Sequence, residues 1–261
     1  MDCFPNNSAP RSTAGGPSRF EILGPLGSGG MGRVWRARDR RLGRVVALKS
    51  FAVAAGEARP MIEAEARAAA PLHHPGIATV FELAEVDGGL VLVMEYVEGE
   101  TLAARLAGGP LEVAEAVGLF GRLADAVAAA HGRGVVHGDL TSANVMLTAE
   151  DQPKILDFGL ARLRGTGSTP GAEAAGTLPY VAPEVLSGAP AGQRSDLYAL
   201  GVLLYEALAG RRPFGTGGAL GEPPPAASIS TGRTRGCGPG DRSPVDPALG
   251  ACPSACARRR G

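Results

Sequence analysis

The first third of the chain consists of short apolar segments separated by turn residues. Residues 34–38 and 44–51 flank one short turn, and residues 79–86 and 90–97 flank Asp-Gly-Gly, a connection typical of hairpins. Between these two pairs, residues 57–70 are rich in Ala, Glu and Arg, as in a helix. The pattern therefore predicts two pairs of strands with one helix between them.

Beyond residue 99 the pattern becomes helical. Apolar residues recur at steps of three and four along residues 111–131, which predicts a helix with one apolar face. The residues expected on that face are Val113, Val117, Phe120, Ala124 and Val127. Residues 195–209 predict a second, mostly apolar helix. A sheet-dominated lobe followed by a helical lobe indicates an α+β, two-lobe arrangement.

Composition divides the chain of 261 residues into four parts. We expect residues 1–19 to form a flexible arm, residues 20–98 a β-rich N-lobe and residues 99–214 a helical C-lobe. Residues 215–261 contain 10 Gly and 7 Pro, so we expect a disordered or unrelated tail.

Charge and cysteine content exclude several classes of protein. The formal net charge is +0, so no strong field attracts nucleic acid or an anionic membrane. The four Cys residues leave residues 4–236 without cysteine, which excludes a disulfide framework for the whole domain. We see neither a signal peptide nor a membrane-spanning segment, and we expect a cytoplasmic protein.

A glycine-rich stretch, G-S-G-G-M-G-R-V, occupies residues 27–34. Glycines allow backbone amides to approach phosphate oxygens because no side chain intervenes. A dinucleotide-binding turn requires a helix immediately afterwards, whereas a strand-like segment follows in this chain. The loop is therefore expected to join two strands, which disfavours a dinucleotide-binding fold.

Four polar residues carry the candidate chemistry. Lys49 ends V-A-L-K, Asp139 and Asn144 lie in H-G-D-L-T-S-A-N, and Asp157 opens D-F-G. A carboxylate at the end of an apolar strand is suited to binding Mg²⁺ that bridges phosphates. Lys49 stands out because the 26 basic residues include only two lysines, the other being Lys154.

Two further motifs complete the set: G-T-L-P-Y-V-A-P-E at residues 176–184 and S-D-L-Y-A-L-G at residues 195–201. In order and spacing, the six motifs resemble those of the eukaryotic-like serine/threonine protein kinases of bacteria. The resemblance extends from Phe20 to Phe214. It implies a two-lobe kinase fold, ATP and Mg²⁺ as cofactors, and an unidentified protein as substrate.

The resemblance also implies a role for each matching residue. Asp139 would orient the substrate hydroxyl and accept its proton, with Lys49 and Asn144 as the other catalytic residues. Asn144 and Asp157 would hold Mg²⁺, and Lys49 would contact the phosphates of ATP. Asp196 would hold the backbone of the catalytic loop in place.

The remaining predicted residues would surround the nucleotide. Lys49 would form an ion pair with Glu65 of the predicted helix, with Glu63 as the alternative partner. Met94 would be the gatekeeper of the adenine pocket, and the backbone of residues 95–97 would hold adenine. The predicted cofactor-binding residues besides Lys49 are Leu26, Gly27, Ser28, Gly29, Gly30, Met31, Gly32, Arg33, Val34, Ala47, Glu65, Met94, Glu95, Val97 and Met146.

Two substitutions depart from the family pattern. Gly138 replaces the Arg of H-R-D, which usually pairs with a phosphorylated loop, so dependence on such phosphorylation should be weaker. Thr141 stands where these kinases carry a Lys that neutralises the transferred phosphoryl group. Its absence is expected to reduce the rate on the order of 10²-fold.

The third departure concerns the C-lobe, whose later helices have no recognisable counterpart after Phe214. We therefore expect a truncated, incomplete C-lobe. Glu184 would be left as a buried, unpaired carboxylate. Apolar side chains of the helix at residues 195–209 would lose part of their cover, namely Leu203, Leu204 and Leu208.

The function expected from the sequence is transfer of the γ-phosphoryl group of ATP to Ser or Thr hydroxyls of proteins. One alternative is a truncated relic or pseudokinase that binds nucleotide or partners, which the missing helices would favour. Another is a small-molecule kinase of the aminoglycoside or choline type, because its catalytic loop also follows H-G-D with a later Asn.

Overall fold

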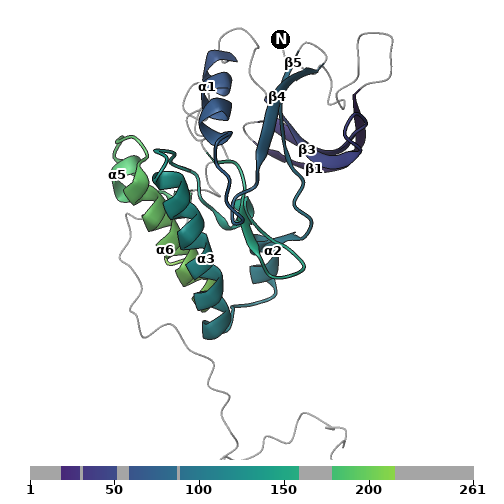
Figure 1. Ribbon diagram of the computed structural model, residues 1–261. Coiled ribbons are helices and arrows are strands. Elements are labelled where there is room, and N and C mark those ends of the chain that lie inside the picture. Colours follow the sequence, from purple (N-terminus) through teal and green to yellow (C-terminus); the bar gives the residue numbers. More distant parts are fainter. Residues whose placement is uncertain (1–18, 30–31, 52–58, 87–88, 159–177, 215–261) are drawn as a thin grey trace, which may run out of the picture. The chain divides into compact units, whose positions relative to one another are not determined.

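The computed structural model describes residues 19–29, 32–51, 59–86, 89–158 and 178–214 (Figure 1). All of these belong to the first of two structural units, Met1–Thr231. Its elements are β1 (Phe20–Gly29), β2 (Gly32–Asp39), β3 (Arg44–Phe51), α1 (Arg59–Ala69), β4 (Val80–Val86), β5 (Gly89–Glu95), β6 (Glu100–Thr101), α2 (Leu102–Ala107), α3 (Val113–His131), η2 (Ser142–Asn144), β7 (Val145–Leu147), β8 (Pro153–Ile155), η4 (Leu178–Tyr180), α5 (Pro183–Leu186) and α6 (Gln193–Ala209).

An antiparallel five-stranded sheet forms the N-lobe, with the strand order β1-β2-β3-β5-β4. Successive side chains of a strand point to opposite faces. Leu48 is therefore buried in a cluster with Phe20 on one face, whereas Ala47 packs with Ile62 of α1 on the other. Lys49 follows Leu48 and so shares the face of Ala47. The predicted helix at residues 57–70 is confirmed as α1, which lies beside the sheet (Figure 1).

The first described residue, Arg19, is attached to this sheet. Its guanidinium lies 2.7 Å from the carboxylate of Asp39 and 2.6 Å from that of Glu82. Asp39 is fully buried, and its hydrogen bond with Arg19 lowers the pKa of its carboxyl below the usual value. The sequence prediction had assigned Arg19 to the flexible arm.

In the C-lobe, α3 and α6 run side by side (Figure 1). The predicted apolar face of α3 is wrong in part, because Val113 and Val117 are 48% and 66% exposed and Ala124 is also exposed. Packing against α6 and β8 selects a neighbouring stripe of the helix. The buried residues of α3 are Ala116, Leu119, Phe120, Leu123, Ala126, Val127 and Ala130.

Two further expectations for the C-lobe are wrong, one for Leu203 and one for Glu184. Leu203 is completely buried, whereas Leu204 and Leu208 are only partly buried against the same core. The large apolar side chain of α6 that faces outward is Leu197, which is 56% exposed. Glu184 is exposed on the short helix α5, so its carboxylate is hydrated rather than buried.

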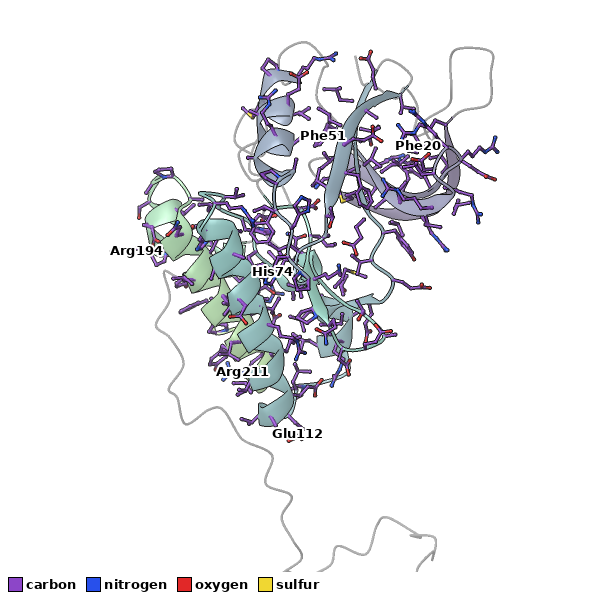
Figure 2. All side chains as sticks on the ribbon, viewed as in Figure 1. Phe20, Phe51, His74, Glu112, Arg194 and Arg211 are labelled. Carbon is purple, nitrogen blue, oxygen red and sulfur yellow. The ribbon has the colours of Figure 1, made fainter. Side chains whose placement is uncertain are left out.

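Backbone hydrogen bonds connect the two lobes. Ala78 N donates to Ile155 O, and Ile155 N donates to Gly76 O, each at 2.9 Å. The segment before β4 therefore pairs with β8 of the three-stranded sheet β6-β7-β8. His74, which accepts a hydrogen bond from Gly76 N, marks this junction (Figure 2). Among the described residues, no helix has the length and apolar character needed to cross a membrane.

Candidate active site

A cavity of about 520 Å³ is lined by residues of both lobes. It brings together most of the residues that the sequence predicts to bind nucleotide or metal. Those that line it are Leu26, Gly27, Ser28, Gly32, Val34, Ala47, Lys49, Met94, Glu95, Val97, Asn144, Met146 and Asp157.

The other predicted residues are not among those that line the cavity. Arg33 pairs with Ser50 of β3, and its backbone NH and carbonyl both bond to the Ser50 hydroxyl. Because side chains alternate along β2, Val34 points to the cavity and Arg33 does not. Gly30 and Met31 lie outside the described residues, as does the side chain of Glu65, and Gly29 is described only through its pairing with Gly32.

The glycine-rich segment joins two antiparallel strands, which confirms the prediction. Gly27 pairs with Val34, and Gly29 pairs with Gly32. Gly32 has a φ of 135°, and a Cβ there would lie 1.8 Å from the carbonyl oxygen of Ser50. Only glycine fits this position, so the second strand can begin close against β3 above the cavity.

Lys49 is the buried cation of the site. Its side chain is 5% exposed, and Nζ lies 2.7 Å from Oδ2 of Asp157. A buried charge requires such a partner, because desolvation of an isolated ammonium is very costly. The pair connects β3 of the N-lobe to Asp157, which lies two residues after the end of β8. The expected pairing of Lys49 with Glu65 stays a prediction, since the Glu65 side chain lies outside the described residues.

Asp139 and Asn144 are held together in the loop before β7. Nδ2 of Asn144 donates to the backbone carbonyl of Asp139 at 2.7 Å and to its Oδ2 at 3.2 Å. A carbonyl oxygen only accepts hydrogen bonds, so the amide nitrogen must face Asp139. This orientation leaves the amide oxygen of Asn144 to serve as a metal ligand.

Asp196 of α6 fixes the backbone of this loop. Its carboxylate is 1% exposed and accepts hydrogen bonds from His137 N at 2.8 Å and from Gly138 N at 2.7 Å. His131 of α3 donates a third bond from Nε2 at 2.8 Å. The expected role of Asp196 is thus confirmed. Gly138 has a φ of 74°, a conformation that glycine adopts without strain.

The ring of His137 connects Asp139 to the backbone of Leu156. Nε2 lies 2.8 Å from the carbonyl oxygen of Leu156 and therefore carries the proton. Nδ1 then accepts a hydrogen bond from Asp139 N at 3.2 Å. The same ring meets Phe158 edge-on, with 4.9 Å between centroids. The loop that carries Asp139 is thereby tied to the strand end that carries Asp157.

The donor atoms at the cavity are suited to Mg²⁺. Asn144 and Asp157 both line it and offer an amide oxygen and a carboxylate. Mg²⁺ prefers oxygen ligands and commonly uses one or two carboxylates together with substrate phosphates. The part of the chain that the structure describes contains no cluster of three or more His, Cys, Asp or Glu side chains that would hold a metal by itself. A site completed by phosphates is consistent with this donor set.

Comparison with known proteins identifies the family. The chain matches the protein kinase domain over residues 20–221. It belongs to the protein kinase family. The kinase PknA of Mycobacterium tuberculosis is 40% identical over 224 residues, which cover 79% of this chain and 52% of PknA. PrkC of Bacillus subtilis is 38% identical over 201 residues, which cover 75% of this chain and 31% of PrkC. Both relatives are named serine/threonine-protein kinases.

A solved kinase structure has the same fold. The kinase domain of M. tuberculosis PknI superimposes with a TM-score of 0.66 and 30% sequence identity, and the match covers 84% of each chain. The two-lobe kinase fold expected from the sequence is therefore confirmed. The chain spans about half of PknA and about a third of PrkC, so it matches only part of each curated relative.

Four further residues line the kinase cavity, and the sequence prediction missed them: Gly99, Thr101, Ala143 and Leu156. Tyr96 also lines it, within the segment 95–97 that was expected to hold adenine. Gly99 had a detectable signal, because a lone Gly after an apolar strand often marks a tight backbone approach. Its φ is 146°, and a Cβ there would lie 1.9 Å from the carbonyl oxygen of Leu147. Thr101 caps α2 by accepting a hydrogen bond from Ala104 N. Ala143 and Leu156 have side chains without a distinctive pattern.

Proposed function

We propose that this chain is an ATP-dependent serine/threonine protein kinase that transfers the γ-phosphoryl group of ATP to Ser or Thr hydroxyls of proteins. The observation that carries the proposal is that Lys49, Asn144 and Asp157 line one cavity, while Asn144 also contacts Asp139. Lys49 and Asp157 lie 2.7 Å apart, and Asn144 contacts Asp139 at 2.7 Å. The names of the relatives support Ser and Thr as acceptors.

The cavity wall fits a nucleotide. Val34 and Ala47 from the sheet and Met146 from β7 provide apolar surface from both lobes, which suits a planar base. The segment Glu95–Val97 adds backbone donors and acceptors at the same wall. Lys49 supplies a positive charge for the phosphates, and its burial strengthens that interaction relative to water.

Asp139 would receive the acceptor hydroxyl. As a carboxylate it accepts a hydrogen bond from the hydroxyl, which orients the oxygen toward the phosphate and gives its proton a destination. Asn144 keeps the Asp139 carboxylate in place through the bond to Oδ2. When bound, Mg²⁺ would neutralise negative charge on the phosphates, and the residues suited to hold it are Asn144 and Asp157.

Gly138 and Thr141 would set the rate and the regulation of this activity. Thr141 is a neutral side chain, 7% exposed, at the position where the family carries a Lys. The transition state would lose one stabilising charge, so we expect a slow kinase. Gly138 offers no cation to a phosphorylated loop, so we expect activity without prior loop phosphorylation.

The experiment that tests this function compares three acceptors. The purified chain is incubated with Mg²⁺ and labelled ATP, together with a generic protein substrate, an aminoglycoside or choline. The proposal requires label on the protein substrate, and loss of that label in Lys49→Met. Label only on a small molecule would replace the proposal with small-molecule phosphotransfer. A nucleotide-induced rise in Tm without any transfer would indicate a nucleotide-binding pseudokinase.

A further inference from the structure

Arginine is concentrated in the first three strands of the N-lobe. Residues 19–44 contain seven Arg and two acidic residues, which leaves five positive charges in a chain whose formal net charge is +0. Both acidic residues are engaged, because Asp39 binds Arg19 and Glu21 lies 3.4 Å from Arg40. Within the described residues, the other five arginines have no carboxylate partner. This part of the sheet therefore carries an uncompensated positive charge.

Arg36 and Arg38 lie on the same face of β2, and both are exposed. The residues opposite them on β3 are Ala47 and Val45, which carry no charge. Glu21 of β1 is opposite Arg38, but its carboxylate pairs with an arginine of the following turn. Residues two apart on a strand are about 7 Å apart. The two long side chains can therefore reach one anion together.

An aromatic ring supports the first of these two arginines. The guanidinium of Arg36 lies over the Tyr96 ring, 5.0 Å from its centre. A guanidinium over a ring keeps its N–H donors directed outward in its own plane. A phosphate group offers three acceptor oxygens and a charge of about −1.5 to −2, and it binds such donors in parallel pairs. The pair Arg36 and Arg38 is therefore suited to a phosphorylated side chain.

The chain's own N-terminal segment contains acceptors for a phosphate. Residues 1–18 contain one acidic and one basic residue, so the unmodified segment has no net side-chain charge. Its hydroxyl residues are Ser8, Ser12, Thr13 and Ser18. Each phosphate would add about −1.5 to −2 charges. Phosphorylation would thus convert a neutral segment into an anionic one.

This segment joins the sheet next to the arginine pair. The carbonyl of Arg19 accepts a hydrogen bond from Arg40 N at 2.9 Å, and Arg38 lies opposite Glu21, two residues further along β1. Because β1 is an edge strand, the chain before it can reach either face without crossing the sheet. Thr13 precedes Arg19 by six residues, which span up to about 20 Å. The pair is therefore within reach of the segment.

We propose that Arg36 and Arg38 bind a phosphoserine or phosphothreonine within the chain's own residues 8–18. The inference rests on the proposed function, which supplies the phosphate. In that transfer the acceptor hydroxyl gives its proton to Asp139 and its oxygen bonds to the γ-phosphorus of ATP. The bond from this phosphorus to the β-phosphate oxygen breaks, and ADP leaves. The new phosphate then binds the two guanidiniums, whereas the unmodified segment has no net charge to hold it there.

Synthetic peptides test the binding without requiring phosphate transfer. Fluorescent peptides of residues 5–18 carry either no phosphate or one phosphate, placed on each hydroxyl residue in turn. A scrambled phosphopeptide of the same composition is the matched partner. The full chain is first treated with a phosphatase, and Kd is measured by anisotropy. We expect one phosphopeptide to bind about tenfold more tightly than both its unphosphorylated and its scrambled partner.

The double variant Arg36→Gln, Arg38→Gln should abolish that preference. Because both side chains are exposed, its Tm should stay within about 2 °C of the parent. Arg133→Gln is the matched control, since Arg133 is an exposed arginine of the C-lobe, and it should keep the preference. A preference that survives the double variant overturns the inference. So does equally tight binding of the scrambled phosphopeptide, or binding of phosphatidylserine vesicles without any preference for a phosphopeptide.

Mass spectrometry of the parent after incubation with Mg²⁺ and ATP completes the test. We expect phosphate on at least one hydroxyl residue within residues 8–18. Phosphorylation of a generic protein substrate without phosphate in this segment overturns the inference and leaves the proposed function standing. Selective binding of the synthetic phosphopeptide, without transfer to any protein by the parent, supports the binding site but contradicts the proposed function.

Discussion

Lys154 Nζ lies 2.7 Å from Oε1 of Glu95, and this ion pair fastens β8 to the end of β5. The other carboxylate oxygen of Glu95 accepts a hydrogen bond from Thr79 N at 3.1 Å. The second lysine of the chain, Lys49, pairs with Asp157 just after β8. Each of the two lysines therefore connects an N-lobe strand to the region of β8. Glu95 lines the nucleotide cavity, so the ion pair holds the wall that would contact adenine.

Removal of this ion pair should weaken nucleotide binding more than it slows catalysis. In Lys154→Met, Glu95 keeps its bond to Thr79 but loses its anchor on β8, so the wall becomes less well ordered. We expect the KM for ATP to rise about threefold to tenfold, with kcat changed less than twofold. Lys154→Arg should restore most of the affinity because it can rebuild the pair. An unchanged KM in Lys154→Met, measured by steady-state kinetics, would show that the pair has no positioning role.

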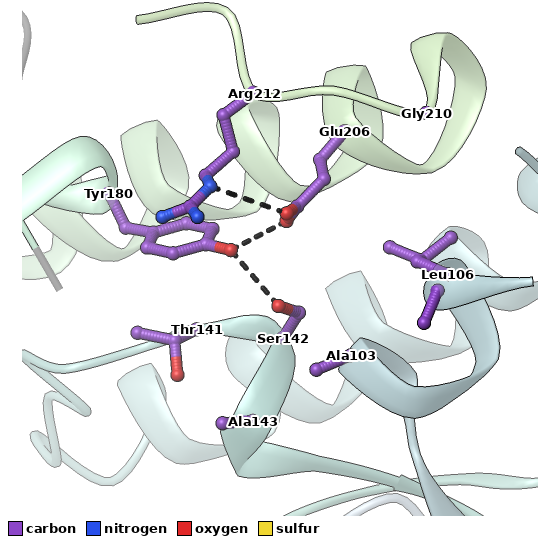
Figure 3. A pocket seen from close by; sticks show the side chains of 10 residues that line it. Ala103, Leu106, Thr141, Ser142, Ala143, Tyr180, Glu206, Gly210 and Arg212 are labelled. Atoms are coloured by element: carbon purple, nitrogen blue, oxygen red, sulfur yellow. Dashed lines mark hydrogen bonds and ion pairs between the residues drawn. The ribbon is translucent and has the colours of Figure 1, made fainter. Parts of the chain in front are cut away.

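Restoring a positive charge beside Asp139 should accelerate the reaction. Thr141 lines a second cavity, of about 490 Å³, which leaves space for a longer side chain (Figure 3). Thr141→Lys would place an ammonium near the transferred phosphoryl group, and we expect kcat to increase on the order of tenfold to 10²-fold. Thr141→Met, of similar length without charge, is the control. Equal rates for Lys and Met at this position would argue against the electrostatic explanation.

Asp196→Asn should destabilise the fold. The carboxylate accepts three hydrogen bonds at a position that is 1% exposed, and an amide provides only one accepting oxygen. We expect a loss of about 2–3 kcal/mol in unfolding free energy and a fall in Tm of roughly 5–10 °C, measured by thermal denaturation. Asp125→Asn alters an exposed carboxylate on α3 and should leave Tm within about 2 °C of the parent. Similar Tm values for the two variants would contradict the role of Asp196.

The phenol of Tyr180 should make stability fall in alkaline solution. Its pKa is about 12 in the folded chain because of burial and the bond to Glu206, compared with about 10 for an unperturbed Tyr. The unfolded chain then ionises first, so the stabilisation is complete below pH ~10 and is lost as pH rises toward 12. Urea unfolding at pH 8–11.5 should show a shallower decline for Tyr180→Phe than for the parent. Parallel curves would exclude this contribution of Tyr180.

The chemistry of the site was accessible from the sequence, because its residues belong to short motifs with fixed neighbours. Lys49, Asn144 and Asp157 were predicted individually, and the structure brings them to one cavity. The Lys154–Glu95 pair was not predicted, since its members lie 59 residues apart and the sequence around one residue does not indicate the other. The contact of Arg212 with Glu206 was also missed, because it depends on the turn at Gly210.

The burial of α3 shows a different limit of sequence reasoning. Apolar residues occur on more than one side of this helix, so two stripes with steps of three and four are available. The prediction chose the stripe containing Val113 and Val117, whereas packing against α6 buries the one containing Leu119 and Leu123. Periodicity identifies a helix in such a segment, but the neighbouring helix determines which face is buried.

The most direct test of the account is the single-turnover rate of phosphate transfer at saturating Mg²⁺ and ATP, with phosphorylated residues of the acceptor identified by mass spectrometry. The account predicts phosphoserine or phosphothreonine for the parent. It predicts a rate about 10²- to 10⁴-fold lower for Asp139→Asn, whose nucleotide-induced rise in Tm remains that of the parent. Equal rates for parent and Asp139→Asn, or no phosphorylated Ser or Thr with the parent, would contradict it.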